Sequence, residues 1–285
     1  MRGSPGSMTV LRPRSAAEAV ILCAKHPGCL PLAGGTDLMV LWNMGELNGR
    51  RVLDLSGVAE WRAVRKTAAG LRVGALATHA ELRDDAFVRR EFPLLAQAAA
   101  AVGAAQIQNR GTLGGNIANA SPAGDTFPAL AVYEARIGVV SAKGERDIPF
   151  SEFFAGVKKT NLAPGELVSE IELPFPPSRP RRQLFRKVGT RAAMAISKTV
   201  AAGLLWLGPD HRVRELRFAL GSMAPTVRRL RAVEEFSRGK RLTAEVAAQA
   251  CQLMSQDICP IDDVRSTAEY RLRVSQNLLA AFLLG

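Results

Sequence analysis

The sequence predicts an α+β protein with two main parts, and three observations support this. Residues 8–59 and 60–175 each combine helical and strand-like patterns around a glycine pair. Four prolines between Pro174 and Pro180 then indicate a semi-rigid linker. After the linker, three strand-like segments precede three helical ones, which is the order typical of an α+β domain.

Length and composition set the outer limits. The chain has 285 residues, 47% of them hydrophobic, so it can bury a sizeable core. Residues 1–7 resemble an expression scar, and Met8 is the expected native start. No apolar run is long enough for a membrane span and no secretory layout follows Met8, so we expect a cytoplasmic protein. The cysteines lack the short spacing of zinc or iron–sulfur sites, which predicts no metal and four reduced thiols: Cys23, Cys29, Cys251 and Cys259.

The formal net charge is +12, so a polyanion or an acidic subunit could be a partner. The basic residues are spread along the chain, however, and are densest from Arg179 to Arg191. Aromatic residues make up 6% and do not alternate with basic ones, as they would on a base-stacking surface. We therefore expect no nucleic-acid binding.

In the expected first subdomain, residues 8–59, a glycine pair separates a strand from a helix. Ser15 and Glu18 have the spacing of a capping box and begin a helix that ends near Pro27. The other expected elements are a strand over 29–33, a helix over 38–44 and a strand over 51–55.

In the expected second subdomain, residues 60–175, two helices precede a long loop. Thr78 is the expected N-cap of the first helix, with Glu81 three residues later, and the alanine-rich segment 86–102 predicts the second. We expect an irregular loop over 106–128, and loops of this length are uncommon unless they bind something. The expected strands are 70–74, 136–142 and 167–173, with a turn at Lys143 and Gly144.

The expected C-terminal domain, residues 184–285, follows a Pro/Arg-rich linker over 176–183. It should contain a sheet and three helices. The expected strands are 184–188, 199–207 and 213–220, and the expected helices are 226–238, 243–255 and 266–284.

The first glycine loop, Pro31 to Leu38, predicts a diphosphate site. A diphosphate needs several N–H donors that converge on its oxygens, and successive backbone amides provide them where glycine permits close approach. Gly34 and Gly35 end a strand and lead into a helix, whose N-terminus adds free N–H groups. The hydroxyl of Thr36 can donate one more hydrogen bond to a phosphate oxygen.

The second glycine loop, Asn109 to Asp125, has similar chemistry. Gly114 and Gly115 predict a second cradle of amides, and Asn116, Asn119, Ser121 and Asp125 offer donors and acceptors to ribose hydroxyls. One such glycine pair alone is more often a tight turn, but two of them on neighbouring subdomains favour binding. Neither loop has the Rossmann fingerprint or the P-loop pattern, so those nucleotide sites are disfavoured.

The two loops resemble those of a known family. The pattern Ala33-Gly-Gly-Thr-Asp-Leu38, followed by Thr112-Leu-Gly-Gly-Asn-Ile-Ala-Asn-Ala-Ser-Pro-Ala-Gly-Asp125, is similar to the FAD-binding subunits of the xanthine dehydrogenase and carbon monoxide dehydrogenase family of molybdenum hydroxylases. Val73–Glu81 and Ile261–Tyr270 resemble the same family. The resemblance covers nearly everything after Met8, and the second loop is its most specific part.

The resemblance implies a two-part FAD-binding domain of the vanillyl-alcohol-oxidase type, followed by a domain of sheet plus three helices. It implies FAD as a non-covalent cofactor, since no histidine lies in a glycine loop, and no catalytic residue beyond the flavin. Carried over by motif, the implied cofactor-binding residues are Leu32, Ala33, Gly34, Gly35, Thr36, Asp37, Leu38, Thr112, Gly115, Asn116, Asn119, Asp125, Val168 and Lys187.

The resemblance also implies two partner subunits. A small two-iron–two-sulfur (2Fe-2S) subunit would donate electrons, and a large molybdopterin subunit would hydroxylate the substrate, in a heterotrimer that can itself dimerise. After Arg191 some family members carry acidic residues that tune a nicotinamide site, whereas this chain reads Ala192-Ala-Met-Ala195. This puts NAD in doubt as the electron acceptor and leaves a quinone, another carrier or oxygen open.

Two other functions stay open at this point. A stand-alone flavin oxidoreductase of the same fold would need its own acid–base residues, and the loops offer few. A basic polyanion-binding protein would bind nucleic acid in a salt-sensitive manner. His79 is expected mainly to stabilise a helix start, with a role at the flavin as the less favoured interpretation.

Overall fold

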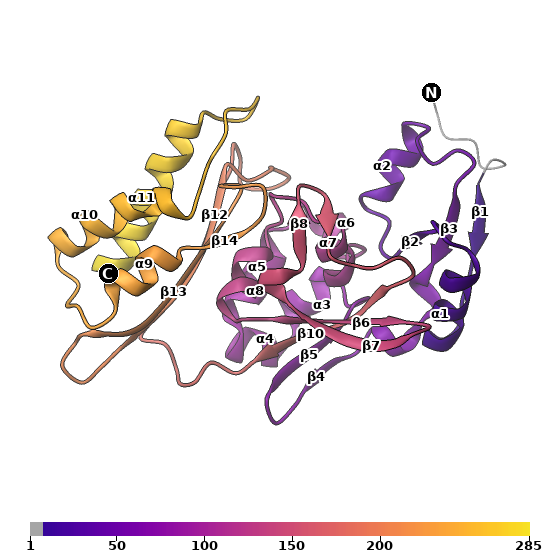
Figure 1. Ribbon diagram of the computed structural model, residues 1–285, viewed down its shortest axis with the longest axis horizontal. Coiled ribbons are helices and arrows are strands. Elements are labelled where there is room, and N and C mark those ends of the chain that lie inside the picture. Colours follow the sequence, from indigo (N-terminus) through magenta and orange to yellow (C-terminus); the bar gives the residue numbers. More distant parts are fainter. Residues whose placement is uncertain (1–7) are drawn as a thin grey trace.

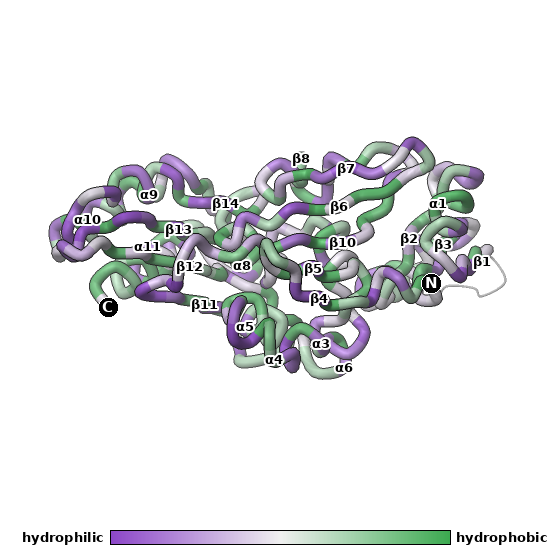
Figure 2. The backbone as a smooth tube through the Cα atoms, turned by 90° about the horizontal axis from the view of Figure 1, so that it is seen from below, coloured by the Kyte–Doolittle hydropathy of each residue, from purple (hydrophilic) through white to green (hydrophobic). Residues whose placement is uncertain are grey.

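Three sheets follow one another along the long axis of the molecule (Figure 1). This computed structural model describes residues 8–285, so the expected expression scar at 1–7 lies outside the described residues. The N-terminal sheet and the C-terminal domain occupy opposite ends, and Figure 2 shows the same order from below. The α+β class predicted from the sequence is confirmed.

The N-terminal sheet is parallel, with strand order β1-β3-β2. Ser15 caps α1, because its side chain accepts a hydrogen bond from the amide of Glu18 at 3.2 Å, so the predicted start of this helix is confirmed. The elements are β1 (Thr9–Leu11), α1 (Ala16–Lys25), β2 (Leu30–Leu32), α2 (Leu38–Asn43) and β3 (Arg51–Asp54).

The central sheet is antiparallel, with strand order β4-β5-β10-β6-β7. Its strands are β4 (Val64–Lys66), β5 (Gly70–Gly74), β6 (Arg136–Ser141), β7 (Gly144–Pro149) and β10 (Leu167–Pro174), and a separate hairpin holds β8 (Phe154–Gly156) and β9 (Lys159–Thr160). The helices are α3 (His79–Asp84), α4 (Ala86–Glu91), α5 (Pro93–Ala101), α6 (Ala105–Gln108), α7 (Leu113–Ala118) and α8 (Phe127–Val132).

Two expectations for the central region were wrong. The single helix expected over 86–102 is broken at Phe92, because Pro93 has no N–H and instead begins α5. The irregular loop expected over 106–128 contains α7 and parts of α6 and α8. Helices of four to six residues are too short to give a clear helical pattern in the sequence, and α7 also contains two glycines.

The C-terminal sheet is antiparallel, with order β11-β12-β13-β14. The three predicted strands and three predicted helices are confirmed, but β14 occupies the start of the helix expected over 226–238, which begins only at Arg231. The elements are β11 (Arg182–Val188), β12 (Thr199–Leu207), β13 (Val213–Gly221), β14 (Arg228–Arg229), α9 (Arg231–Ser237), α10 (Ala244–Leu253) and α11 (Ala268–Leu284).

The C-terminal sheet is buried on both faces. Along β12, Ala202, Leu204 and Trp206 belong to the core shared with the central region, whereas Ala201 and Leu205 belong to the core formed with α9, α10 and α11. Successive side chains of a strand point to opposite faces, which explains why β12 is apolar throughout. The helical layer and the central region therefore pack against the same sheet from opposite sides.

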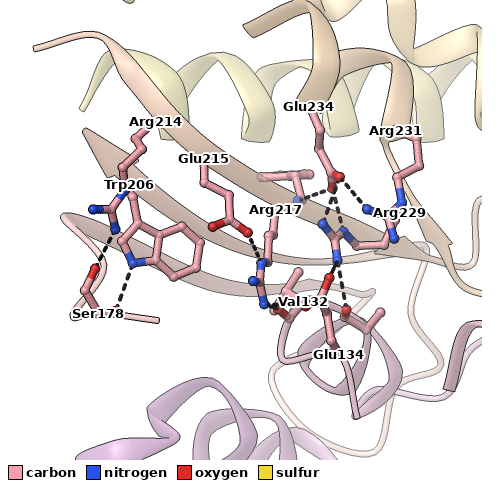
Figure 3. Close-up of polar contacts among 12 residues, drawn as sticks. Val132, Glu134, Ser178, Trp206, Arg214, Glu215, Arg217, Arg229, Arg231 and Glu234 are labelled. Carbon is pink, nitrogen blue, oxygen red and sulfur yellow. Dashed lines mark hydrogen bonds and ion pairs between the residues drawn. The ribbon is translucent and has the colours of Figure 1, made fainter. Parts of the chain in front are cut away.

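Polar contacts join the C-terminal sheet to the end of α8 (Figure 3). Arg217 donates to the carbonyl of Val132 at 3.2 Å, and Arg229 donates to that of Ala131 at 3.2 Å. Both guanidinium groups also pair with Glu134, at 3.1 and 3.4 Å. Cations at a helix C-terminus satisfy its free carbonyls and suit its dipole, so these arginines fix the orientation of α8.

Among residues 8–285, no helix combines the length and the apolar character that crossing a membrane requires. All four cysteines are free thiols.

Candidate functional site

A cavity of about 510 Å³ lies between the two glycine loops. The turn from β2 to α2 forms one wall, α7 and the residues before it form another, and the start of β10 closes a third side. The expected residues that line it are Ala33, Gly34, Gly35, Thr36, Asp37, Leu38, Thr112, Gly115, Asn116, Asn119 and Val168.

The first glycine loop supplies free backbone donors to this cavity. The amides of Gly34, Gly35, Thr36 and Asp37 find no hydrogen-bond acceptor within the part of the chain that the structure describes. Gly35 has φ +76°, a conformation that glycine adopts without strain and that turns the chain sharply into α2. A row of such amides at the end of a strand is suited to an anion.

The second glycine loop differs from the expected second cradle. The amide of Leu113 donates to Ala77 and that of Gly114 to Ala75, each at 2.9 Å, and the amide of Gly115 donates to the Thr112 hydroxyl at 3.1 Å. The N-terminus of α7 is thus already satisfied by the protein. This loop forms a wall of the cavity rather than a second set of free amides.

The two loops touch each other at Gly34. A side-chain carbon at Gly34 would lie 1.8 Å from the carbonyl oxygen of Arg110, which no real contact allows. Gly114 is similarly tight, since a carbon there would lie 2.6 Å from both the methyl group and the carbonyl oxygen of Ala75. These glycines permit the backbone of one loop to lie directly on its neighbour.

Polar side chains connect the loops at the rim of the cavity. Asn119 donates to Asp37 at 3.2 Å and accepts from Lys158 at 2.5 Å, so it joins both loops to the β8–β9 hairpin. Asn116 accepts a hydrogen bond from Thr126 at 2.7 Å, which fixes its amide group at the cavity wall.

Three expected site residues lie outside the cavity: Leu32, Asp125 and Lys187. Asp125 was expected to accept from ribose hydroxyls, but its two oxygens are occupied by the Lys187 ammonium, at 2.6 Å, and by the Ser197 hydroxyl. Burial raises the pKa of the Asp125 carboxyl, while Lys187 and Ser197 oppose that shift. Lys187 also donates to the carbonyl of Ala101 at 2.8 Å, so this buried pair holds the chain next to Val102, which does line the cavity.

His79 is more closely tied to the site than its sequence context indicated. The predicted N-cap is Thr78, and its capping box with Glu81 is confirmed. His79 is 2% exposed, lines the cavity, and has a ring Nδ1 that is sealed from solvent and finds no hydrogen-bond partner among the described residues. Burial lowers the pKa of His79 to about 4, so its ring is neutral at neutral pH.

The apolar part of the cavity wall also went unpredicted. Leu41, Leu76, Val102 and Ile107 all line it. These residues occur in ordinary core-like patterns, and only the packing of the loops identifies them as cavity residues.

The comparisons with known proteins agree with this geometry. The family model for the FAD binding domain in molybdopterin dehydrogenase matches residues 6–176, and that for the CO dehydrogenase flavoprotein C-terminal domain matches residues 184–285. The chain belongs to the family of FAD-binding subunits of xanthine and CO dehydrogenases. The cofactor of this family, FAD, fits the site, because the unpaired amides of the first loop suit its diphosphate.

Similar members of the family cover almost the whole chain. The xanthine dehydrogenase FAD-binding subunit of Escherichia coli is 30% identical over 94% of this chain and 91% of its own length. The carbon monoxide dehydrogenase medium chain of Hydrogenophaga pseudoflava is 30% identical over 94% and 92%. Among solved structures, carbon monoxide dehydrogenase from that organism matches with a TM-score of 0.92 and 26% identity over 99% of this chain and 97% of that one. Quinoline 2-oxidoreductase from Pseudomonas putida matches with a TM-score of 0.91 and 26% identity over 100% and 97%.

Proposed function

We propose that this FAD-dependent oxidoreductase subunit takes electrons from a 2Fe-2S subunit and passes them to an external acceptor. The single observation that supports this best is the row of amides from Gly34 to Asp37, unpaired within the described part of the chain, beside a cavity walled by the second loop. Bound flavin would supply the redox chemistry, since it can accept electrons singly and release them in pairs. The protein would hold the cofactor and exclude water.

The residues divide this work according to their positions. The amides of the first loop, with the Thr36 hydroxyl, bind the FAD diphosphate. Leu32 sets the end of β2, and Thr112, Gly115 and Asn116 form the opposite wall. Val168 contributes from β10. Asp125 and Lys187 act from behind the wall by holding the carbonyl of Ala101.

The partners follow from the division of labour among the relatives. The similar subunits belong to dehydrogenases named for different compounds: xanthine, caffeine and carbon monoxide. All of these subunits nevertheless match over most of this chain. This supports substrate selection on another chain. We place the substrate on a large molybdopterin subunit and the electron donor on a small 2Fe-2S subunit, in a cytoplasmic heterotrimer that can pair into a dimer.

An absorption spectrum of the purified chain tests the cofactor, with FAD added if needed. Flavin bands, and FAD identified by mass in the supernatant after acid precipitation, are the expected result. A colourless chain that also fails to bind added FAD would overturn the proposal. Purification from the native host tests the partners: the FAD-loaded chain should copurify with one larger and one smaller subunit. Steady turnover of an organic substrate by the isolated chain would instead favour a stand-alone oxidoreductase.

A substitution in the second loop tests the location. In Gly115→Val the new side chain begins 3.8 Å from the Ala33 methyl group and 2.9 Å from the Thr112 hydroxyl, so it occupies the space between the loops. We expect FAD retention to be lost while the far-ultraviolet circular dichroism stays that of the wild type. Normal FAD retention would show that the cofactor does not lie between these loops.

A further inference from the structure

His79 has features that its place at the start of α3 does not require. Its backbone amide donates to the carbonyl of Gly111 at 3.0 Å, so it is fixed to the second glycine loop. Its side chain lines the cavity although it is 2% exposed, and no hydrogen bond of the ring appears among residues 8–285. A buried polar side chain without a partner is uncommon in proteins and calls for an explanation.

The ring lies close to the joint between the two glycine loops. A carbon added at Gly111 would lie 3.3 Å from Cδ2 of His79 and 3.4 Å from the hydroxyl oxygen of Thr36. The ring of His79 and the hydroxyl of Thr36 therefore both lie next to Gly111. The ring thus lines the same cavity as Thr36 of the first loop, although it comes from a different subdomain.

The surroundings of the ring favour one of the two tautomers of the neutral imidazole. A proton on Nδ1 would be a buried donor without an acceptor, which proteins tolerate less often than a buried lone pair. The proton then lies on Nε2, the nitrogen that is not sealed. A neutral ring gives this donor without the cost of burying a cation.

We infer that His79 is a further FAD-binding residue, whose neutral ring donates a hydrogen bond from Nε2 to an oxygen of the FAD diphosphate. This rests on the proposed FAD site. The ring supplies a donor from the side of the cavity where the amides of the second loop are already bonded within the protein. It also explains a polar side chain at a position where the helix cap needs only Thr78.

Three variants separate this role from packing. His79→Leu removes the donor, His79→Gln places an amide nitrogen near the position of Nε2, and His79→Asn places one near that of Nδ1. Hydrogen bonds to charged groups predict a rise in the Kd of FAD by roughly tenfold to a hundredfold in His79→Leu. We expect a similar rise in His79→Asn and a Kd within about threefold of wild type in His79→Gln. ADP, which carries the diphosphate without the flavin, should lose affinity by the same factor.

The results that overturn the inference are distinct from failure of the site itself. Unchanged FAD binding in His79→Leu, or equal losses in the Leu and Gln variants, would show that His79 only packs. If a variant lost affinity for FAD but not for ADP, His79 would not contact the diphosphate. Nitrogen NMR of the labelled wild-type chain needs no variant: the Nε2 proton should be present and should shift when FAD is added, and a proton on Nδ1 would contradict the inference. A wild-type chain that binds no FAD would instead refute the proposed function.

Discussion

The two glycine loops contain the same pair of residues but use them for different physical reasons. In the first loop, Gly35 turns the chain with φ +76°, and a row of amides there has no partner within residues 8–285. In the second, Gly114 lets α7 lie against Ala75, and the amides at its start are all bonded within the protein. The first loop is thus a set of donors and the second a wall. A glycine pair shows where a side chain is not tolerated, but not whether a ligand or the protein itself fills the space.

Gly34 both contributes a free amide and allows close packing, because its missing side chain lets the first loop contact Arg110 of the second loop. The free amides of one loop are therefore positioned by the closeness of the other. This gives a ranking of expected effects. Changes at the joint or in the space between the loops should affect FAD most, and changes where the second loop packs on Ala75 should affect mainly stability.

The largest effect is expected from Gly34→Ala. The added methyl group cannot lie 1.8 Å from the Arg110 carbonyl oxygen, so the loops must separate and the donors lose their alignment. We expect the Kd of FAD to rise about a thousandfold, or about 4 kcal/mol, as measured by fluorescence titration. Gly49→Ala is the control, because nothing lies within 4 Å of the carbon added there and Gly49, whose φ is +72°, does not line the cavity. If Gly34→Ala bound FAD within about threefold of wild type, the loops would not meet in the way described.

The pH dependence of stability tests whether His79 is buried in its neutral form where the two loops meet. Its pKa is about 4 when folded and about 6.5 in an unfolded chain, so between these values the unfolded state binds the extra proton. The free energy of unfolding should therefore fall as pH decreases from about 6.5 to 4, by roughly 3 kcal/mol at most, and level off for this group below that. Urea unfolding of the FAD-free wild type and His79→Leu over this range measures it. The variant should lack this part of the slope, and two parallel profiles would show that His79 titrates normally in the folded state.

Gly114→Ala should act on stability rather than on the cofactor. The new methyl group would lie 2.6 Å from the Ala75 methyl group, so α7 must move away from the end of β5. Overpacking of this kind costs about 2 kcal/mol. We expect a lower midpoint of urea unfolding and a Kd of FAD within about threefold of wild type for the folded protein. A large loss of FAD affinity without a stability change would reverse the roles given to the two loops.

Local signals explain what could be predicted from the sequence. Ser15, Thr78 and Thr243 each cap a helix whose start was predicted, because a capping hydrogen bond depends only on neighbouring residues. The apolar run of β12 and the prolines before β11 are equally local. The residues that line the cavity were predicted mainly from the resemblance of both loops to one family, because a single glycine pair does not distinguish a binding loop from a tight turn.

The placements that the sequence did not predict depended on contacts between distant segments. Asp125 and Lys187 are 62 residues apart, and their pairing forms only when the C-terminal sheet packs against the central region. The satisfied amides of the second loop depend on Ala75 and Ala77, which lie at the end of another strand. The cavity role of His79 depends on the position of Gly111. None of these partners can be identified from a pattern along the chain.

The smallest effects are expected from substitutions of two threonines, one in each loop, which distinguish the roles of the loops most clearly. The Thr112 hydroxyl accepts a hydrogen bond from the amide of Gly115, so Thr112→Ala should lower the free energy of unfolding by about 1 kcal/mol, the usual value of an N-cap. It also leaves that amide free beside the cavity, so FAD affinity should not fall. Thr36→Val instead removes only the hydroxyl of a residue that lines the cavity, and should weaken FAD binding by about fivefold, or about 1 kcal/mol, with no change in the urea midpoint.

Because the two threonines act on different quantities, the double variant should show both losses without coupling between them. FAD titration and urea unfolding on the same four proteins measure this. A stability loss in Thr36→Val together with an affinity loss in Thr112→Ala would mean that the second loop supplies the donors. A coupling as large as either single effect would mean that the loops share the diphosphate, because the amide released at Gly115 would then compensate for the lost hydroxyl of Thr36.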